Sequence, residues 1–371
     1  MVCASVAKVR ISLAAIGATV LLSSCSPGPS ASAPEPGAGS SSSSPNAGPA
    51  PASAPPTATP MPTPTPTPTP TPSPTPIVLR SPLTGLPEPS PKPVLVVKLD
   101  NTGNAQPHAG LSSADVIYIE EVEWGLTRLA AVFSATIPDR IGPVRSARIT
   151  DIDLLAQYGS PAFAFSGAQR KLWPMLEAAD FEDVSANKGG EGYSRDSGRR
   201  APYNYFADGS TMLERAPAAS LSSDIGFIFA EATPLGGRSA SKVSTEWPSA
   251  SARFVYDPIM GNYNVRLNGE PAKGEEIDGS QQASTVVIQF VQQTASKYQD
   301  RSGGVTPVAK TVGTGKALIL RDGKAWDVTW NRPSKKLGTT FALADGTPMQ
   351  FKPGQVWVVL VDRDRTAKII P

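Results

Sequence analysis

Cysteine and histidine are almost absent from this 371-residue sequence. The two cysteines, Cys3 and Cys25, lie within the first 25 residues, and the single histidine is His108. The rest of the chain therefore has no thiol for a disulfide, a thiolate zinc site or a nucleophile, and a multi-histidine metal site is excluded. We expect no metal site and no cofactor. His108 follows Gln-Pro in a loop without an evident partner, which predicts a surface position.

An excess of basic charge is also missing. The formal net charge is +2, to which Lys8 and Arg10 contribute, while Glu35 is the only charged residue between residues 26 and 76. The later residues are thus close to neutral, whereas nucleic-acid binders usually carry a concentrated basic face. No nucleic-acid partner is expected.

The first residues have the pattern of an export signal that ends in a lipid-accepting cysteine. An apolar run of about 12 residues, from 11 to 22, is too short to span a bilayer of about 30 Å. It ends in Leu22-Ser23-Ser24-Cys25, which resembles the lipobox of bacterial lipoproteins. We expect residues 1–24 to be a signal peptide and Cys25 to be acylated, so that the protein is held on the extracytoplasmic face of the cell membrane. An ordinary secretory signal with a coincidental cysteine is the alternative.

Residues 25–76 are predicted to be a disordered tether. This segment is rich in Pro, Ser, Ala, Thr and Gly, has no aromatic residue and closes with a largely alternating Thr-Pro run. Such a composition buries too little apolar surface to offset the entropy of ordering the chain. The Thr-Pro part favours extended polyproline II, which would raise the following residues above the membrane.

Apolar runs predict a domain of mixed α/β or α+β structure over residues 77–240. The run at 93–99 reads as a buried strand, and further strands are expected at 115–123 and 127–133, joined by a hairpin turn at Glu-Trp-Gly-Leu-Thr. The glutamates at 120, 121 and 123 are expected to include a solvated strand face. Three polar residues lie at strand ends or starts and could orient an arginine or bind a cation: Asp100, Asn101 and Asp115.

Arginines gather in two places in this domain. Arg145 and Arg148 precede a helix that we expect to begin with Thr150 as N-cap, and guanidinium groups beside free backbone amides suit phosphate or carboxylate. The polar, glycine-rich loop at 189–204 also reads as functional. It supplies further anion-binding or supporting candidates: Arg195, Asp196, Arg199 and Asn204.

Residues 241–371 are predicted to form a mainly-β domain. Short apolar segments alternate with turn signals such as Asp322-Gly323, and no helical periodicity is present. The segment Thr311-Val-Gly-Thr-Gly-Lys316 lacks the spacing of a phosphate-binding P-loop and precedes an expected strand. The tryptophans at 326, 330 and 357 could stack on a glycan, although core packing is favoured.

Several of these segments together resemble the YerB-type lipoprotein family, the domain of unknown function 3048. The segments are Lys98-Leu-Asp-Asn101, Ala114-Asp115-Val-Ile-Tyr118, Gly125-Leu-Thr-Arg128, Ile141-Gly-Pro-Val-Arg-Ser-Ala-Arg148, Arg195-Asp196 and Ala201-Pro-Tyr-Asn204. Where the family usually has Pro-His-Asn, this sequence has Pro202-Tyr203-Asn204, so Tyr203 would replace the histidine in any mechanism that needs one. The resemblance implies lipid anchoring and a folded region in two parts, and it supplies no activity.

Two functions follow from these patterns. In the first, an arginine-rich cleft formed by Arg145, Arg148, Arg195 and Arg199 holds an anionic cell-wall polymer or an envelope protein. In the second, the protein is an envelope enzyme on a phosphate-containing or glycan substrate. Its arginines would stabilise charge while Asp100 or Asp115 binds a cation or acts as base. We favour binding.

Overall fold

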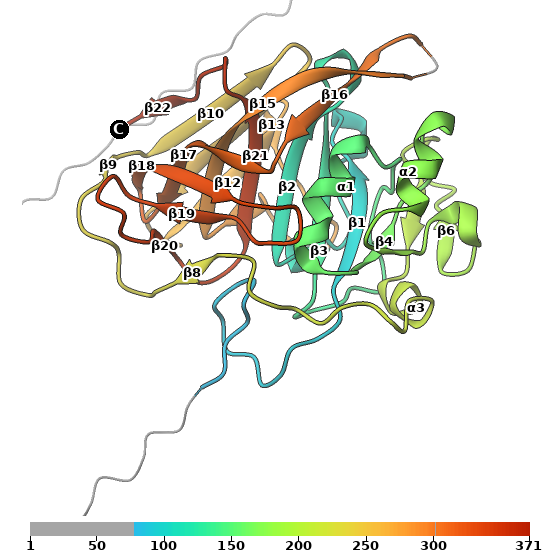
Figure 1. The fold of residues 1–371 in the computed structure, drawn as a ribbon, viewed down its shortest axis with the longest axis horizontal. Helices are drawn as coiled ribbons and strands as arrows, with labels where there is room; N and C mark the ends of the chain where they lie inside the picture. The colour runs from blue at the N-terminus through green and yellow to red at the C-terminus, as the bar shows by residue number, and fades with distance from the viewer. Residues whose placement is uncertain (1–77, 301) are drawn as a thin grey trace, which may run out of the picture. The chain divides into compact units, whose positions relative to one another are not determined.

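The computed structural model describes residues 78–300 and 302–371. The expected signal peptide, Cys25 and the tether up to residue 76 lie outside the described residues. The described chain forms a large mixed sheet, a smaller antiparallel sheet on one of its faces, and helices α1 (Ile149–Leu155) and α2 (Trp173–Glu177) on the other (Figure 1). The expected mixed fold with a mainly-β second part is confirmed.

A mixed sheet of 12 strands organises the molecule, in the order β19-β18-β17-β15-β21-β2-β3-β1-β4-β5, with β16 paired to β15 and β9 to β18. Its strands are β1 Leu95–Asp100, β2 Val116–Glu121, β3 Thr127–Phe133, β4 Ala162–Ala164, β5 Glu182–Asp183, β9 Arg238–Ser239, β15 Thr285–Gln299, β16 Val305–Lys310, β17 Gly313–Arg321, β18 Lys324–Arg332, β19 Thr340–Ala342 and β21 Val356–Asp362.

This sheet contains strands from both of the expected domains. β2 and β21 pair in parallel, from Val116 opposite Val356 to Ile119 opposite Val359. The division into residues 77–240 and 241–371 therefore stays a prediction about the sequence, because the two ranges pair within a single sheet.

Burial on both faces explains the continuous apolar runs of the central strands. Every residue of β1 and β3 is buried, as expected for strands that are covered on each side. β2 and β3 form the expected hairpin, in register from Val116 opposite Val132 to Glu121 opposite Thr127.

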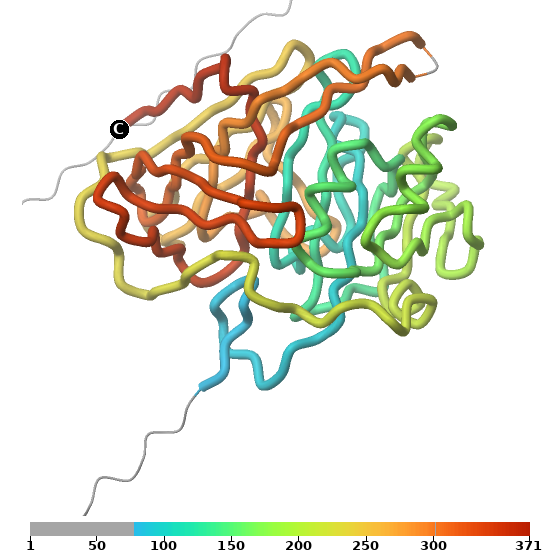
Figure 2. Tube along the Cα trace, viewed as in Figure 1, coloured from blue at the N-terminus to red at the C-terminus, as the bar shows by residue number. Residues whose placement is uncertain are grey.

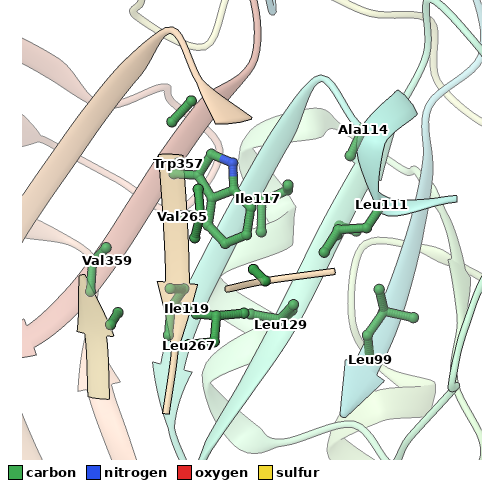
Figure 3. Close-up of a cluster of buried hydrophobic side chains, with 14 of the residues drawn as sticks. Leu99, Leu111, Ala114, Ile117, Ile119, Leu129, Val265, Leu267, Trp357 and Val359 are labelled. Atoms are coloured by element: carbon green, nitrogen blue, oxygen red, sulfur yellow. The ribbon is translucent and has the colours of Figure 1, made fainter. Parts of the chain in front are cut away.

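The smaller sheet has the order β13-β12-β11-β10-β22, with β14 paired to β12. Its strands are β10 Lys242–Trp247, β11 Ala250–Asp257, β12 Asn262–Leu267, β13 Glu270–Pro271, β14 Gln282–Ala283 and β22 Lys368–Ile370. β12 alternates half-buried and buried residues, so one of its faces packs on the large sheet. Figure 3 shows Val265 and Leu267 of β12 beside Ile117, Ile119 and Trp357 of the large sheet.

Helix α1 begins two residues earlier than the sequence predicts. Its N-cap is Arg148, whose backbone N–H donates to Oδ2 of Asp151 at 2.7 Å. Thr150 is instead buried inside the helix, and its hydroxyl accepts the Ala309 N–H at 3.1 Å. The expectation failed because Thr150 is bound by a strand far away in the sequence, while Asp151 serves the helix start.

Three shorter elements complete the fold: helix α3 (Gly209–Glu214), the antiparallel pair of β6 (Tyr193–Arg195) and β7 (Tyr205–Ala207), and the parallel pair of β8 (Ile228–Phe229) and β20 (Gln350–Phe351). Figure 2 shows the chain running from α3 along one end of the molecule to β9. Trp326, Trp330 and Trp357 are at most 4% exposed, which confirms that they pack in the core. Among the described residues, we find no helix with the length and apolarity needed to cross a membrane.

Candidate functional site

The segment at residues 141–145 is held between β1 and β7. The Arg145 N–H donates to the Lys98 carbonyl at 2.7 Å, and the Asp100 N–H donates to the Pro143 carbonyl at 3.0 Å. On the other side, the Val144 N–H donates to the Tyr205 carbonyl at 2.7 Å. These bonds place Arg145 beside the last residues of β1, as the sequence suggested when it gave Asp100 to the same site.

Arg145 and Asp100 form an ion pair, with 2.8 Å between Nε and Oδ2. Asp100 is buried, and its Oδ1 accepts the Thr102 N–H at 2.7 Å as well as the Thr102 hydroxyl. The Arg145 side chain is 25% exposed, and its buried Nε–H is not aligned for a hydrogen bond. Among the described residues, the two terminal nitrogens of Arg145 also have no recorded acceptor.

Arg148 is more completely enclosed. Its Nε and Nη2 donate to Oε2 of Glu123 at 3.0 and 2.6 Å, and its Nη1 donates to the Ala147 carbonyl at 3.1 Å. Burial by itself would raise the pKa of Glu123, but the charge and hydrogen bond of Arg148 lower the pKa below its ordinary value. Arg148 therefore serves the packing of η3 (Glu123–Gly125) against α1.

A third arginine, Arg128 at the start of β3, lies next to these two. It faces Asp100 in the register of β1 and β3, is 8% exposed and donates to the Ser146 carbonyl at 2.7 Å. Burial, together with the charges of Arg148 and Arg145, lowers its pKa to about 9. We call Arg128, Arg145 and Arg148, with Asp100 and Glu123, the arginine site.

Behind the arginine site lies a buried triad of Lys98, Glu120 and Asp151. Lys98 Nζ donates to Oδ1 of Asp151 at 2.6 Å and also to Glu120, and each of the three side chains is at most 1% exposed. Burial raises the pKa of Glu120 to about 7, with a contribution from Asp151 that Lys98 opposes. The expected solvated face of glutamates is thus wrong for Glu120, because α1 covers this face of the sheet, and for Glu123, because it pairs with Arg148.

The loop candidates lie at the neighbouring β6–β7 ribbon. Arg195 is exposed, donates to Oδ1 of Asn204 at 3.0 Å and lies 4.6 Å from the centre of the Tyr205 ring. Arg199 donates to the carbonyls of Ala105 and Pro107, at 2.7 and 2.9 Å, and forms an ion pair with Glu275. It also lines a polar pocket of about 570 Å³ together with Asn104, Gln106, Arg200, Ala201, Pro202 and Tyr203.

Arg140 was missed by sequence reasoning and connects this loop to the smaller sheet. It pairs with Asp196 at 2.7 Å and with Glu275 at 3.0 Å, and its guanidinium group lies 3.5 Å from the centre of the Phe206 ring. Arg140 lies in a Pro-Asp-Arg turn, which gives no local sign of its ion pairs. Its partner Glu275 is too far away in the sequence to be predicted from the turn. Asp196 is thereby engaged in holding the loop.

Two other predicted site residues, Asp115 and Asn101, differ in where the structure places them. Asp115 precedes β2, which runs in the same direction as β1. It therefore lies at the opposite end of the strands from Asp100. Its Oδ2 accepts the N–H groups of Ser134 and Ala135 at 2.6 and 3.0 Å. Asn101 does lie near the arginine site, where its Nδ2 donates to the Thr127 hydroxyl and its Oδ1 is buried without a hydrogen bond.

The expected surface position of His108 is wrong. The side chain is fully buried, and Nε2 lies 2.7 Å from the carbonyl oxygen of Asp100. Burial lowers the pKa of His108, which a backbone hydrogen bond to Asp100 partly opposes. The loop is covered by residues 273–275 of the second half of the chain, which local sequence cannot reveal.

Across residues 78–300 and 302–371, no group of three or more His, Cys, Asp or Glu side chains is arranged to hold a metal ion.

Comparisons with known proteins agree on one family. The profile described as "Protein of unknown function (DUF3048) N-terminal domain" matches residues 83–222, and the corresponding C-terminal domain matches residues 243–358. A Bacillus subtilis (strain 168) protein named "Putative lipoprotein YerB" is 24% identical over 298 residues, which cover 76% of this chain and 86% of that protein. The crystal structure of YerB protein from Bacillus subtilis matches with a TM-score of 0.65 and 21% identity, over 78% of this chain and 99% of that one, and this likeness shows the fold.

Proposed function

The chain belongs to the DUF3048 family of proteins of unknown function, and we propose that it is a lipid-anchored extracytoplasmic protein whose arginine site binds an anionic ligand of the cell envelope. The observation that carries the proposal is that Arg145 is partly exposed and has N–H donors without an acceptor among the described residues. Asp100 holds one side of its guanidinium group, and the side chain keeps a quarter of its surface exposed. Its N–H donors have no recorded acceptor among the described residues, although Nε is buried.

An anion would complete this arrangement. Arginine presents its donors in a rigid fork that matches two oxygens of a carboxylate or phosphate. Arg128 and Arg148 both donate to the carbonyl of Ser146, the neighbour of Arg145, so the three positive charges lie close together and repel. A bound anion would relieve that repulsion.

The proposed anchor rests on separate support. Leu22-Ser23-Ser24-Cys25 has the form of a lipobox, and the related Bacillus subtilis protein bears the name of a lipoprotein. Attachment of lipid at Cys25 would hold the folded part at the extracytoplasmic face of the membrane, where wall polymers and envelope proteins are accessible partners.

Binding is favoured over the enzymatic alternative by the surroundings of the two aspartates. Both carboxylate oxygens of Asp100 already have partners in Thr102 and Arg145. Asp115 lies at the other end of the strands, and its carboxylate accepts hydrogen bonds from two backbone N–H groups. Neither carboxylate is free beside the arginines to act as a base, so an envelope enzyme stays a sequence-based prediction.

Thermal unfolding of the purified protein tests the proposal. Inorganic pyrophosphate, poly(glycerol phosphate) and soluble peptidoglycan fragments are added separately to the wild type and to the Arg145→Ala and Arg145→Lys variants. At a ligand concentration 100 times Kd, we expect about 2.7 kcal/mol of stabilisation in the wild type. Arg145→Ala should remove it, and Arg145→Lys should remove most of it because the fork is lost.

Arg170→Ala is the matched control, since Arg170 is an exposed arginine with no recorded ion pair among the described residues. It should leave the shift unchanged. A shift of the same size in the wild type and in Arg145→Ala would show that the ligand binds elsewhere and would end the proposal for this site.

A further inference from the structure

A cavity of about 1040 Å³ lies where β17 and β18 meet residues 363–369 near the chain end, and no residue of the arginine site lines it. We call it the basic groove. Its charged lining residues are Arg238, Lys310, Lys316, Asp327, Arg363, Asp364 and Arg365. Five of these are basic and two are acidic, whereas the chain after the tether is close to neutral.

Ion pairs account for only part of this charge. Arg238 pairs with Asp327, and Arg365 pairs with Glu121 at 3.2 Å. Lys310, Lys316 and Arg363 are exposed and have no ion-pair partner among the described residues. Asp364 is the remaining acid, so the groove presents an uncompensated positive potential to solvent.

The lining of the groove leaves its backbone open to a ligand. A Cβ at Gly313 of β17 would meet nothing within 4 Å, whereas one at Gly315 would lie 2.6 Å from Trp330. Thr329 is exposed in the same lining, whereas the Thr314 hydroxyl donates to the Trp330 carbonyl at 2.8 Å. Residues 312–316 of the motif Thr311-Val-Gly-Thr-Gly-Lys316 line the groove, and the motif continues into strand β17.

We propose that the basic groove is a second binding site, which takes an extended polyanion with an anionic group in each repeating unit. Lysine ammonium groups are hydrated point charges on flexible stems, which suit repeated charges along a polymer better than one small anion. A cavity of about 1040 Å³ is also much larger than a single phosphate needs. The groove shares no residue with the arginine site, so this proposal does not depend on the proposed function.

The test measures binding of long-chain inorganic polyphosphate to the full protein by fluorescence anisotropy. We expect the triple variant Lys310→Gln/Lys316→Gln/Arg363→Gln to bind about tenfold more weakly and with a shallower salt dependence. The matched control is Lys188→Gln/Lys297→Gln/Lys324→Gln, which removes the same charge from exposed positions outside the groove. That control should keep nearly full affinity.

Several outcomes would overturn the proposal. Equal weakening by both triple variants would mean that polyphosphate responds only to overall charge. Loss of polyphosphate binding in Arg145→Ala would place the polymer at the arginine site. Binding of uncharged dextran with the same affinity would show that charge does not select the ligand. All altered groove positions are exposed, and circular dichroism melts confirm that the variants fold.

Discussion

The arginine site and the basic groove both gather basic side chains against the same large sheet, but they hold them in opposite ways. Around the arginine site, Lys98 and Arg148 are buried and face carboxylates. In the groove, Lys316 and Arg363 are exposed and have no ion-pair partner in the described part of the chain. The difference follows from solvation, because a buried charge needs a partner whereas an exposed charge keeps its water.

This contrast separates the two regions by what a substitution should do. Charges of the buried triad are fixed by the fold and are needed for it. The groove charges without an ion-pair partner among the described residues are Lys310, Lys316 and Arg363, and we expect that folding does not need them. Stability measurements can therefore test the comparison without knowledge of any ligand.

The largest effect is expected for Lys98→Met. The change leaves Glu120 and Asp151 buried beside each other without their shared cation. Breaking a buried pair by removing one partner costs about 3–5 kcal/mol. Urea denaturation at neutral pH should show that loss in the free energy of unfolding.

Lys316→Met makes the same chemical change in the groove and is the matched control. Its free energy of unfolding should stay within about 0.5 kcal/mol of the wild type. A comparable loss in both variants would mean that the two lysines are equally structural, and the comparison of the two regions would fail.

Local sequence predicted the elements of the fold better than the charge partners. The strand expected at 127–133 coincides with β3, since the apolar pattern there reflects burial of the strand itself. Arg145 and Asp100 were also assigned to one site. Asp100 lies at the end of a predicted buried strand, and Arg145 lies just before a predicted helix.

The triad could not be predicted in this way. Lys98 and Asp151 are 53 residues apart, and their contact depends on how α1 packs on β1. Glu120 reads as a solvated residue on an alternating strand until that helix covers it. His108 was placed at the surface for the same reason, because the residues that cover it come from the second half of the chain.

Asp115 provides a further test of how burial affects a charge. Its carboxylate is buried and has no cation at ion-pair distance among the described residues. Burial raises its pKa to about 6, although the Ala135 and Ser134 N–H groups oppose the change. A carboxyl whose pKa is higher in the folded than in the unfolded state stabilises the fold below its unfolded pKa. That stability is lost as the pH rises through about 6.

Asp115→Asn keeps an acceptor for the two N–H groups and removes the titration. Relative to the wild type, the variant should gain about 2–3 kcal/mol in the free energy of unfolding between pH 4 and pH 7.5. Denaturation curves across this range measure the change. Asp345→Asn is the control, because hydrogen bonds from Thr347 lower the pKa of Asp345 below 3.8, so its stability difference should stay nearly flat over this pH range. A flat difference for Asp115→Asn would show that the buried carboxylate titrates normally.

Arg145 is intermediate in character between the two regions, and its effect should be intermediate too. It is partly exposed like the groove residues, yet it faces a buried carboxylate in Asp100. We expect Arg145→Ala to lower the free energy of unfolding by about 1 kcal/mol, between the losses for Lys98→Met and Lys316→Met. Differential scanning calorimetry in low and high salt measures this. A loss as large as that of Lys98→Met would assign Arg145 to the structural network, whereas a small loss leaves its unused donors available for a ligand.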